Sequence, residues 1–169
     1  MKRVGLSLIA VLFAAAPMAA ETGYEAWLRY PYIDDAIARA RYDALPATVF
    51  AAGETQVIAS ARQELIRGVA GMLERTLRVE KALPKESAII LGTIGELRKV
   101  IPGLGLTGDL PEEGFWLRTV TAQGAPRLVV AGGSDRGVLY GTFALLRRIA
   151  LHQPVSPLDE RQAPYAPVR

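Results

Sequence analysis

The sequence predicts an α/β fold, a mixed β-sheet with helices on both faces. Segments with strand composition alternate with segments of helical periodicity, an order typical of sheets covered by crossover helices. One continuous apolar run, residues 87–92, ends in glycine and is typical of a central strand that is buried on both faces. Two further strand segments flank the turn at residues 123–126, which adds an antiparallel hairpin to the sheet.

Residues 1–20 have the pattern of a secretory signal peptide. Lys2 and Arg3 precede an uncharged apolar run, residues 4–16, and small residues follow up to Ala20. The run is shorter than the roughly 20 apolar residues that a transmembrane helix needs. We therefore expect cleavage near Ala20 and export to the periplasm or out of the cell, with an uncleaved membrane anchor as the alternative.

Charge and composition exclude several functional classes. Without Lys2 and Arg3 the chain carries 18 basic and 17 acidic side chains, and none of its segments has the basic cluster that follows a nucleic-acid backbone. Cysteine is absent, which excludes disulfides and thiol chemistry. With one histidine and no asparagine, a histidine-rich metal site and N-glycosylation are also excluded. We predict no cofactor, no metal site and no nucleic-acid partner.

The predicted α/β domain covers residues 21–151 and begins with a strand and a short helix. Residues 24–30 are rich in aromatic side chains and predict an opening strand that Pro31 ends. Apolar spacing over residues 33–45 predicts a short helix, with the acidic pair Asp34–Asp35 in its first turn, where the helix dipole favours negative charge.

A main helix follows two short strand candidates, residues 48–51 and 56–59. Ser60 and Gln63 match the capping-box pattern, so we place the start of this helix at Ser60 and its end near Leu77. One face is apolar and is expected to pack on the sheet. It comprises Ala61, Leu65, Val69, Met72 and Leu73.

The second half of the domain contains the central strand, a helix at residues 93–100, the hairpin strands 115–120 and 127–131, and a last helix from Arg136 to about Ala150. The large apolar residues of the last helix predict its buried stripe. They are Leu139, Phe143, Leu146 and Ala150.

Two glycines inside the last helix, Gly137 and Gly141, lie one turn apart. Glycine costs about 1 kcal/mol against alanine within a helix, so this pair indicates a close approach to another backbone. Beyond the helix, residues 152–169 contain four prolines and predict an extended linker.

Two glycine-rich segments resemble phosphate-binding loops. Residues 103–108 match G-x-G-x-x-G, but they follow a helix and lead into Pro111, whereas a dinucleotide site needs them between a strand and a helix. Residues 132–137 do connect a strand to a helix, yet Asp135 would repel an anion there. We therefore predict a plain loop for the first segment and a helix N-cap at Ser134 or Asp135 for the second.

No catalytic residue can be assigned from the sequence. The doublets Asp34–Asp35 and Glu112–Glu113 are adjacent in the chain, whereas glycosidase carboxylates face each other across a sugar, so we interpret both as solvated. His152 has no triad partner and is interpreted as a surface or C-cap residue. Trp27 and Trp116 are assigned to core packing, with a sugar-stacking platform as the alternative.

Several blocks of the sequence resemble the N-terminal domain of the family 67 α-glucuronidases. They are YEAWLRY at residues 24–30, A-x-x-E-L-x-x-G at residues 61–68, ILGT at residues 90–93, EGF at residues 113–115 and GVLYGTFALLR at residues 137–147. The last two blocks are also similar to the accessory domain of β-hexosaminidases, although Phe115 stands where tyrosine is usual. The opening WLRY favours α-glucuronidase.

The resemblance implies an enzyme that removes 4-O-methylglucuronic acid from glucuronoxylan oligosaccharides by inverting hydrolysis. In that family the acid and base carboxylates lie in a following (β/α)8 barrel, which would also contact the oligosaccharides, and this sequence stops before any barrel strand. No catalytic, cofactor or metal residue can therefore be carried over. A stand-alone exported carbohydrate-binding or scaffold module is the alternative from a different class.

Overall fold

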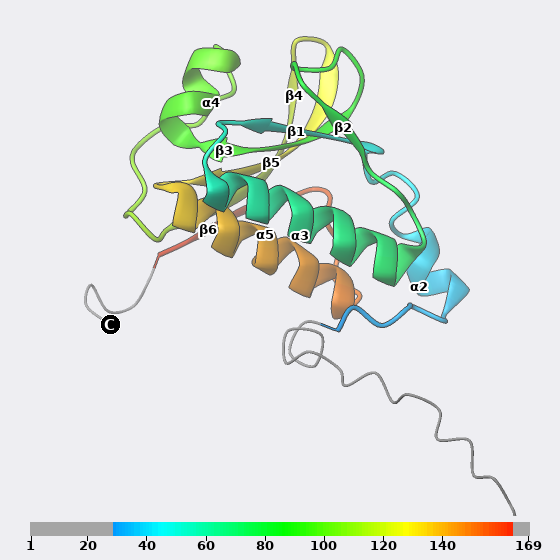
Figure 1. Ribbon diagram of the computed structural model, residues 1–169. Helices are drawn as coiled ribbons and strands as arrows, with labels where there is room; N and C mark the ends of the chain where they lie inside the picture. Colours follow the sequence, from blue (N-terminus) through cyan, green and yellow to red (C-terminus); the bar gives the residue numbers. More distant parts are fainter. Residues whose placement is uncertain (1–28, 164–169) are drawn as a thin grey trace, which may run out of the picture.

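A six-stranded mixed sheet forms the centre of the computed structural model, which describes residues 29–163 (Figure 1). The strand order is β2-β1-β3-β5-β4-β6. The first four strands in this order are parallel, and β4 is antiparallel to both β5 and β6. The strands are β1 (Thr48–Ala52), β2 (Arg78–Glu80), β3 (Ala88–Thr93), β4 (Phe115–Ala122), β5 (Ala125–Gly132) and β6 (Asp159–Gln162).

Helices cover both faces of this sheet, as predicted. The long helices α3 (Gln56–Leu73) and α5 (Asp135–Ala150) lie side by side on one face, and the short α4 (Ile94–Val100) lies on the other (Figure 1). The small helix α2 (Ala36–Ala40) lies beside the C-terminal ends of α3 and α5. The central strand β3 sends Ile89 and Leu91 toward α3 and α5, and Ile90 toward α4.

The hairpin turn is tighter than predicted. Gln123 and Gly124 both have positive φ angles, 52° and 76°, which is the two-residue turn whose twist suits paired strands. Pro126 therefore lies within β5, where it pairs with Thr121 of β4 beyond the end of β3. At that position its missing N–H interrupts no ladder with β3.

The main helix begins earlier than predicted, and the strand expected at residues 56–59 is wrong. Thr55 caps α3 by accepting a hydrogen bond from the backbone N–H of Ile58 at 3.3 Å, while the Ser60 hydroxyl donates to the Gln56 carbonyl inside the helix. Glu74, at φ 52°, ends the helix before Leu77. The exposed strand β2 was missed because three residues show no periodicity.

The predicted apolar face of α3 is confirmed, whereas the predicted stripe of α5 is right only in part, with Leu146 in the core and Leu139 packed against it. Leu146 is buried, but Leu139 and Phe143 are half-buried and Ala150 is exposed. The residues that face the sheet are instead Gly137, Val138, Gly141, Thr142, Leu145 and Ile149. Spacing of large apolar residues misses this stripe because two of its members are glycines that allow close packing.

The ends of the domain also differ from prediction. Only residues 36–40 of the predicted helix 33–45 are helical, with Asp35 as the N-cap. Part of the predicted linker packs on the domain, since Val155 and Leu158 are buried and β6 pairs with β4. Arg29 and Tyr30 are not in a strand, and the rest of the predicted opening strand and the signal peptide lie outside the described residues.

Candidate functional site

Two sequence blocks that resemble the α-glucuronidase family meet at a buried carboxylate. Tyr30, from the opening block, donates a 2.6 Å hydrogen bond to Oε1 of Glu64, from the α3 block. Arg67 donates to the same oxygen at 2.7 Å, and its guanidinium lies 5.4 Å from the centre of the Tyr30 ring. Burial and the neighbouring Glu64 raise the pKa of Tyr30, which keeps the phenol protonated.

This cluster is structural rather than catalytic. Glu64 is 5% exposed and is neutralised by Arg67, so it presents no free carboxylate to a substrate. The burial of Glu64 was not predicted, because the apolar face expected for this helix did not include it. A charged residue flanked by Ala61 and Leu65 on an apolar face is the sequence signal that could have identified it.

Two further resembling blocks, EGF at residues 113–115 and GVLYGTFALLR at residues 137–147, meet where α5 begins. A Cβ atom at Gly137 would overlap the carbonyl oxygen of Gly114, and one at Gly133 would overlap that of Pro111. A Cβ at Gly141 would lie 2.8 Å from Val130 Cγ1. The predicted close approach to another backbone is therefore confirmed at Gly137, whereas Gly141 makes room for the side chains of Val130 and Phe115.

The carboxyl ends of the parallel strands, where open α/β sheets usually bind ligands, are occupied by the protein itself. The N-termini of α3, α4 and α5 all follow such strand ends and lie at one edge of the sheet (Figure 1). Thr55 and Thr93 cap α3 and α4, and the Thr55 hydroxyl donates to Asp135 Oδ2 at 2.6 Å. Acidic side chains in the first turns, Glu96 and Asp135, make this edge unfavourable for an anion.

Neither glycine-rich segment forms a phosphate site. Residues 132–137 are covered by the loop before β4. Ser134 is the N-cap residue of α5, as predicted, but its hydroxyl donates to the Glu112 carbonyl and makes no capping hydrogen bond to the helix. Gly103, Gly105 and Gly108 have φ angles of 83°, 69° and 77°, as expected for a plain loop.

Three arginines fasten that loop, a feature that sequence analysis missed. They donate to four successive carbonyls, those of residues 105–108. The donors are Arg118, Arg98 and Arg161, and Arg98 serves two of the carbonyls. Because the donors come from β4, α4 and β6, no local spacing in the sequence reveals them.

The acidic doublets and His152 have the roles that were predicted for them. Asp35 caps α2, and hydrogen bonds from the backbone N–H groups of Ala38 and Ile37 lower its pKa. Glu112 is solvent-exposed and pairs with Arg136 at 2.8 Å. His152, at φ 55°, follows α5 and donates its backbone N–H to Ile149, as a residue that terminates a helix does.

Trp116 is a core residue, as predicted. It is 4% exposed, and its indole N–H donates to Asp159 at 2.6 Å. The guanidinium of Arg161 lies 3.7 Å from its ring centre and that of Arg118 lies 5.0 Å away, so the ring is closed to a stacking sugar. Trp27 lies outside the described residues.

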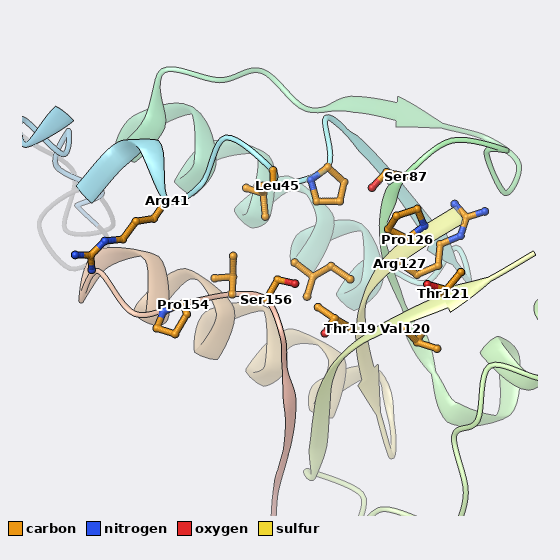
Figure 2. Close-up of a pocket in the computed structure, with 14 residues that line it drawn as sticks. Arg41, Leu45, Ser87, Thr119, Val120, Thr121, Pro126, Arg127, Pro154 and Ser156 are labelled. Carbon is orange, nitrogen blue, oxygen red and sulfur yellow. The ribbon is translucent and has the colours of Figure 1, made fainter. Parts of the chain in front are cut away.

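An open groove of about 960 Å³ lies at the hairpin end of the sheet (Figure 2). Its walls come from the segment before β1, the strands β4 and β5, and residues 154–156. Arg41 is at one end, and the hydroxyl side chains of Ser87, Thr121 and Ser156 line it without any carboxylate. The groove can offer hydrogen bonds to a ligand but has no acid or base for hydrolysis.

Metal and membrane signals are also missing from residues 29–163. Within that range, histidine, aspartate and glutamate side chains do not gather in threes as a metal centre would require. The helices of the same range are too short or too polar to cross a bilayer.

Fold and site together define a mixed α/β domain whose recognisable blocks serve packing. The chain belongs to glycosyl hydrolase family 67, because residues 26–145 match the family model described as "Glycosyl hydrolase family 67 N-terminus". It is 34% identical to a probable alpha-glucuronidase A of Aspergillus terreus, covering 100% of this chain and 20% of that protein. It is 31% identical to an alpha-glucuronidase of Hypocrea jecorina, over 82% of this chain and 17% of that protein.

A solved structure supports the fold. A family GH115 4-O-methyl-alpha-glucuronidase with specificity for decorated arabinogalactans is similar over 62% of this chain and 13% of its own, with 28% identity and a TM-score of 0.50. The chain thus spans no more than a fifth of the relatives and the structure compared.

Proposed function

We propose that this chain is the non-catalytic N-terminal domain of an exported α-glucuronidase. The observation that carries the proposal is the match to the N-terminus of family 67 in a chain that spans a fifth of its α-glucuronidase relatives. Its carboxylates support the same conclusion. Glu64 and Asp35 are engaged in internal hydrogen bonds, and the Glu112–Glu113 doublet pairs with Arg136.

The complete enzyme would remove 4-O-methylglucuronic acid from glucuronoxylan oligosaccharides by inverting hydrolysis, with both catalytic carboxylates in a barrel outside this chain. We expect the purified chain to release no 4-O-methylglucuronic acid from aldouronic acids. Release above the level of a heat-treated control would contradict the proposal. The anomeric configuration of the first product of the complete enzyme, followed by NMR, tests the inverting mechanism.

The identity of the parent enzyme has a separate test. A β-hexosaminidase-like parent is the alternative that shares the blocks at residues 113–115 and 137–147. Decoding the gene beyond Arg169 and assaying its full product on aldouronic acids, decorated arabinogalactan and an N-acetylglucosaminide distinguishes these parents. Activity on the N-acetylglucosaminide alone would overturn the α-glucuronidase proposal.

One observation supports the alternative function of a stand-alone carbohydrate-binding module, namely the hydroxyl-lined groove at the hairpin end. Isothermal titration of the chain with glucuronoxylan oligosaccharides tests it. We expect no heat of binding. Micromolar binding that is lost in Arg41→Ala would mean that this domain, rather than the barrel, recognises the oligosaccharide. Export is tested by N-terminal sequencing of the secreted protein, which should begin near Glu21.

A further inference from the structure

The floor of the groove at the hairpin end is a part of the sheet that the long helices leave uncovered. Thr119 and Thr121 alternate along β4 with Leu117, which packs in the core beneath α3 and α5, so all three side chains are on the same face. Leu128 of that core pairs with Thr119 across the hairpin and also lines the groove. The described residues that line the groove belong to neither α3 nor α5.

The walls of the groove are mostly apolar and rigid. Three prolines line it, of which Pro46 is half-buried and Pro126 and Pro154 are exposed. Proline has a fixed φ angle and no backbone N–H, so these positions keep their shape without a hydrogen-bond partner. The described lining residues include no aromatic side chain on which a sugar ring could stack. The groove therefore suits apolar side chains better than a sugar.

The two charged side chains among these lining residues are both basic, and they lie at opposite ends of the groove (Figure 2). At one end Arg41 is exposed, and its guanidinium donates a long hydrogen bond of 3.4 Å to the His152 carbonyl oxygen. Asp35 lies close enough to Arg41 to interact with its charge, but its carboxylate accepts two backbone N–H groups of α2. Arg41 can therefore accommodate a further carboxylate.

At the other end, Arg127 is a buried cation whose partners are uncharged. It is 2% exposed, and its guanidinium donates to the carbonyl oxygens of Glu86 and Pro84 at 2.5 and 2.8 Å. Within residues 29–163 its Nε has no acceptor, and burial lowers the pKa of Arg127. Because water screens a buried charge weakly, Arg127 acts on the groove through its field and favours an anionic occupant.

We propose that the groove binds a segment of the parent enzyme from beyond Arg169, with apolar side chains against the prolines and a carboxylate on Arg41. This inference rests on the proposed function, in which most of the enzyme lies outside this chain. The end of β6 is opposite Phe115, six residues of β4 away from Thr121, so the segment follows a return of about 20 Å. A tethered segment reaches an effective concentration up to the millimolar range, which favours it over a separate protein.

Photo-cross-linking in the full product of the gene tests this docking. The amino acid p-benzoylphenylalanine, placed at Thr121 on the floor or at Ser156 on a wall, should cross-link to one shared segment beyond Arg169 that contains an aspartate or a glutamate. Mass spectrometry of the digested protein identifies the segment. The matched control has the same amino acid at Lys99, an exposed position of α4 on the other face of the sheet, and should not reach that segment.

Charge reversal tests the carboxylate. Arg41→Glu should lower the cross-linked fraction about fivefold, because it replaces attraction by repulsion, whereas Lys99→Glu should leave it unchanged. An equal effect of the two substitutions would overturn the proposal. So would a cross-linked segment without an acidic side chain, or cross-links confined to residues 1–169 or to a second copy of the chain.

The groove and the proposed function can fail separately. An active α-glucuronidase that lacks the cross-link would overturn the groove proposal alone. A product that cleaves only the N-acetylglucosaminide but cross-links as expected would overturn the parent's identity and support the groove. Two positions are used so that a variant that does not fold leaves the other to decide, and a gene that ends at Arg169 would overturn the proposal because it encodes no occupant.

Discussion

The two faces of the sheet are held in different ways. On one face, α3 and α5 have 18 and 16 residues and pack through glycines onto each other and onto the sheet. On the other face, α4 has seven residues, and the loop that follows it is fastened by arginine side chains that donate to its carbonyls. The first face contains most of the blocks that resemble the family, whereas the second receives only Ile90 and the α4 cap Thr93, both from the ILGT block.

The two faces should differ in how well they tolerate an added side-chain atom. Glycine contacts to backbone atoms leave no room for adjustment, whereas a long arginine side chain can move or be replaced by water. The long-helix face should therefore respond sharply to one added methyl group, and the α4 face should respond weakly or gain stability.

The largest effect is expected for Gly137→Ala. The new Cβ would overlap the Gly114 carbonyl oxygen and lie 3.2 Å from Gly132 Cα, both of which are backbone atoms that cannot rotate away. We expect a loss on the order of 3 kcal/mol or more in the free energy of unfolding. Urea unfolding followed by circular dichroism measures it. A variant with unchanged stability would remove the distinction between the faces.

A smaller effect is expected at the buried carboxylate on the same face. Tyr30→Phe removes the 2.6 Å hydrogen bond to Glu64 and should cost about 1 kcal/mol, while Glu64→Gln weakens both charge-assisted bonds and should cost about 1 to 3 kcal/mol. The same unfolding measurement compares them. If Glu64→Gln were neutral, packing alone would hold Tyr30.

The Tyr30 bond also predicts a pH dependence. Burial and Glu64 raise its pKa above the ordinary tyrosine value of about 10, so the folded state favours the protonated phenol. The stabilisation is complete below pH 10 or so and is lost as the pH rises further. The stability difference between the wild type and Tyr30→Phe should therefore narrow above that pH, and a constant difference would contradict the assignment.

The fold was largely predictable because long apolar patterns decide it. The run at residues 87–92 identified the central strand, and Ala61, Leu65 and Val69 identified the packed face of α3. The errors have local causes. The spacing of Leu139 and Phe143 outweighed the glycine stripe of α5, and the prolines of residues 152–169 concealed a strand that forms only by pairing with β4.

For the candidate site, the sequence mainly showed which residues do not form a catalytic or phosphate-binding site. Spacing alone excluded the doublets and the loop at residues 103–108, because a site needs residues at particular places in the fold. It could not show that Tyr30 and Glu64 meet, since 34 residues separate them. Nor could it show that Arg118 contacts the Gly105 carbonyl, which depends on how the loop folds back.

On the second face, Arg118→Met tests whether the arginine contacts contribute to stability. Methionine keeps the apolar stem but removes the hydrogen bond to Gly105 and the cation that lies over Trp116. We expect a loss of about 1 kcal/mol. The exposed pair of Arg136 with Glu112 provides the control, and Arg136→Met should leave the thermal midpoint unchanged. If Arg118→Met lost as much stability as Gly137→Ala, the two faces would be equally sensitive to substitution.

The smallest effect, and the only gain, is expected for Gly95→Ala on α4. Apart from its chain neighbours and the backbone of its own helix, no atom lies within 4 Å of the position that its Cβ would take, and its φ angle is not in the left-handed region. Alanine loses less backbone entropy than glycine on entering a helix, so the free energy of unfolding should rise by about 0.5 kcal/mol. Urea titration beside Gly137→Ala compares one methyl group on each face. A loss of stability at Gly95 would mean that the α4 face is as closely packed as the face of α3 and α5, and the comparison between them would fail.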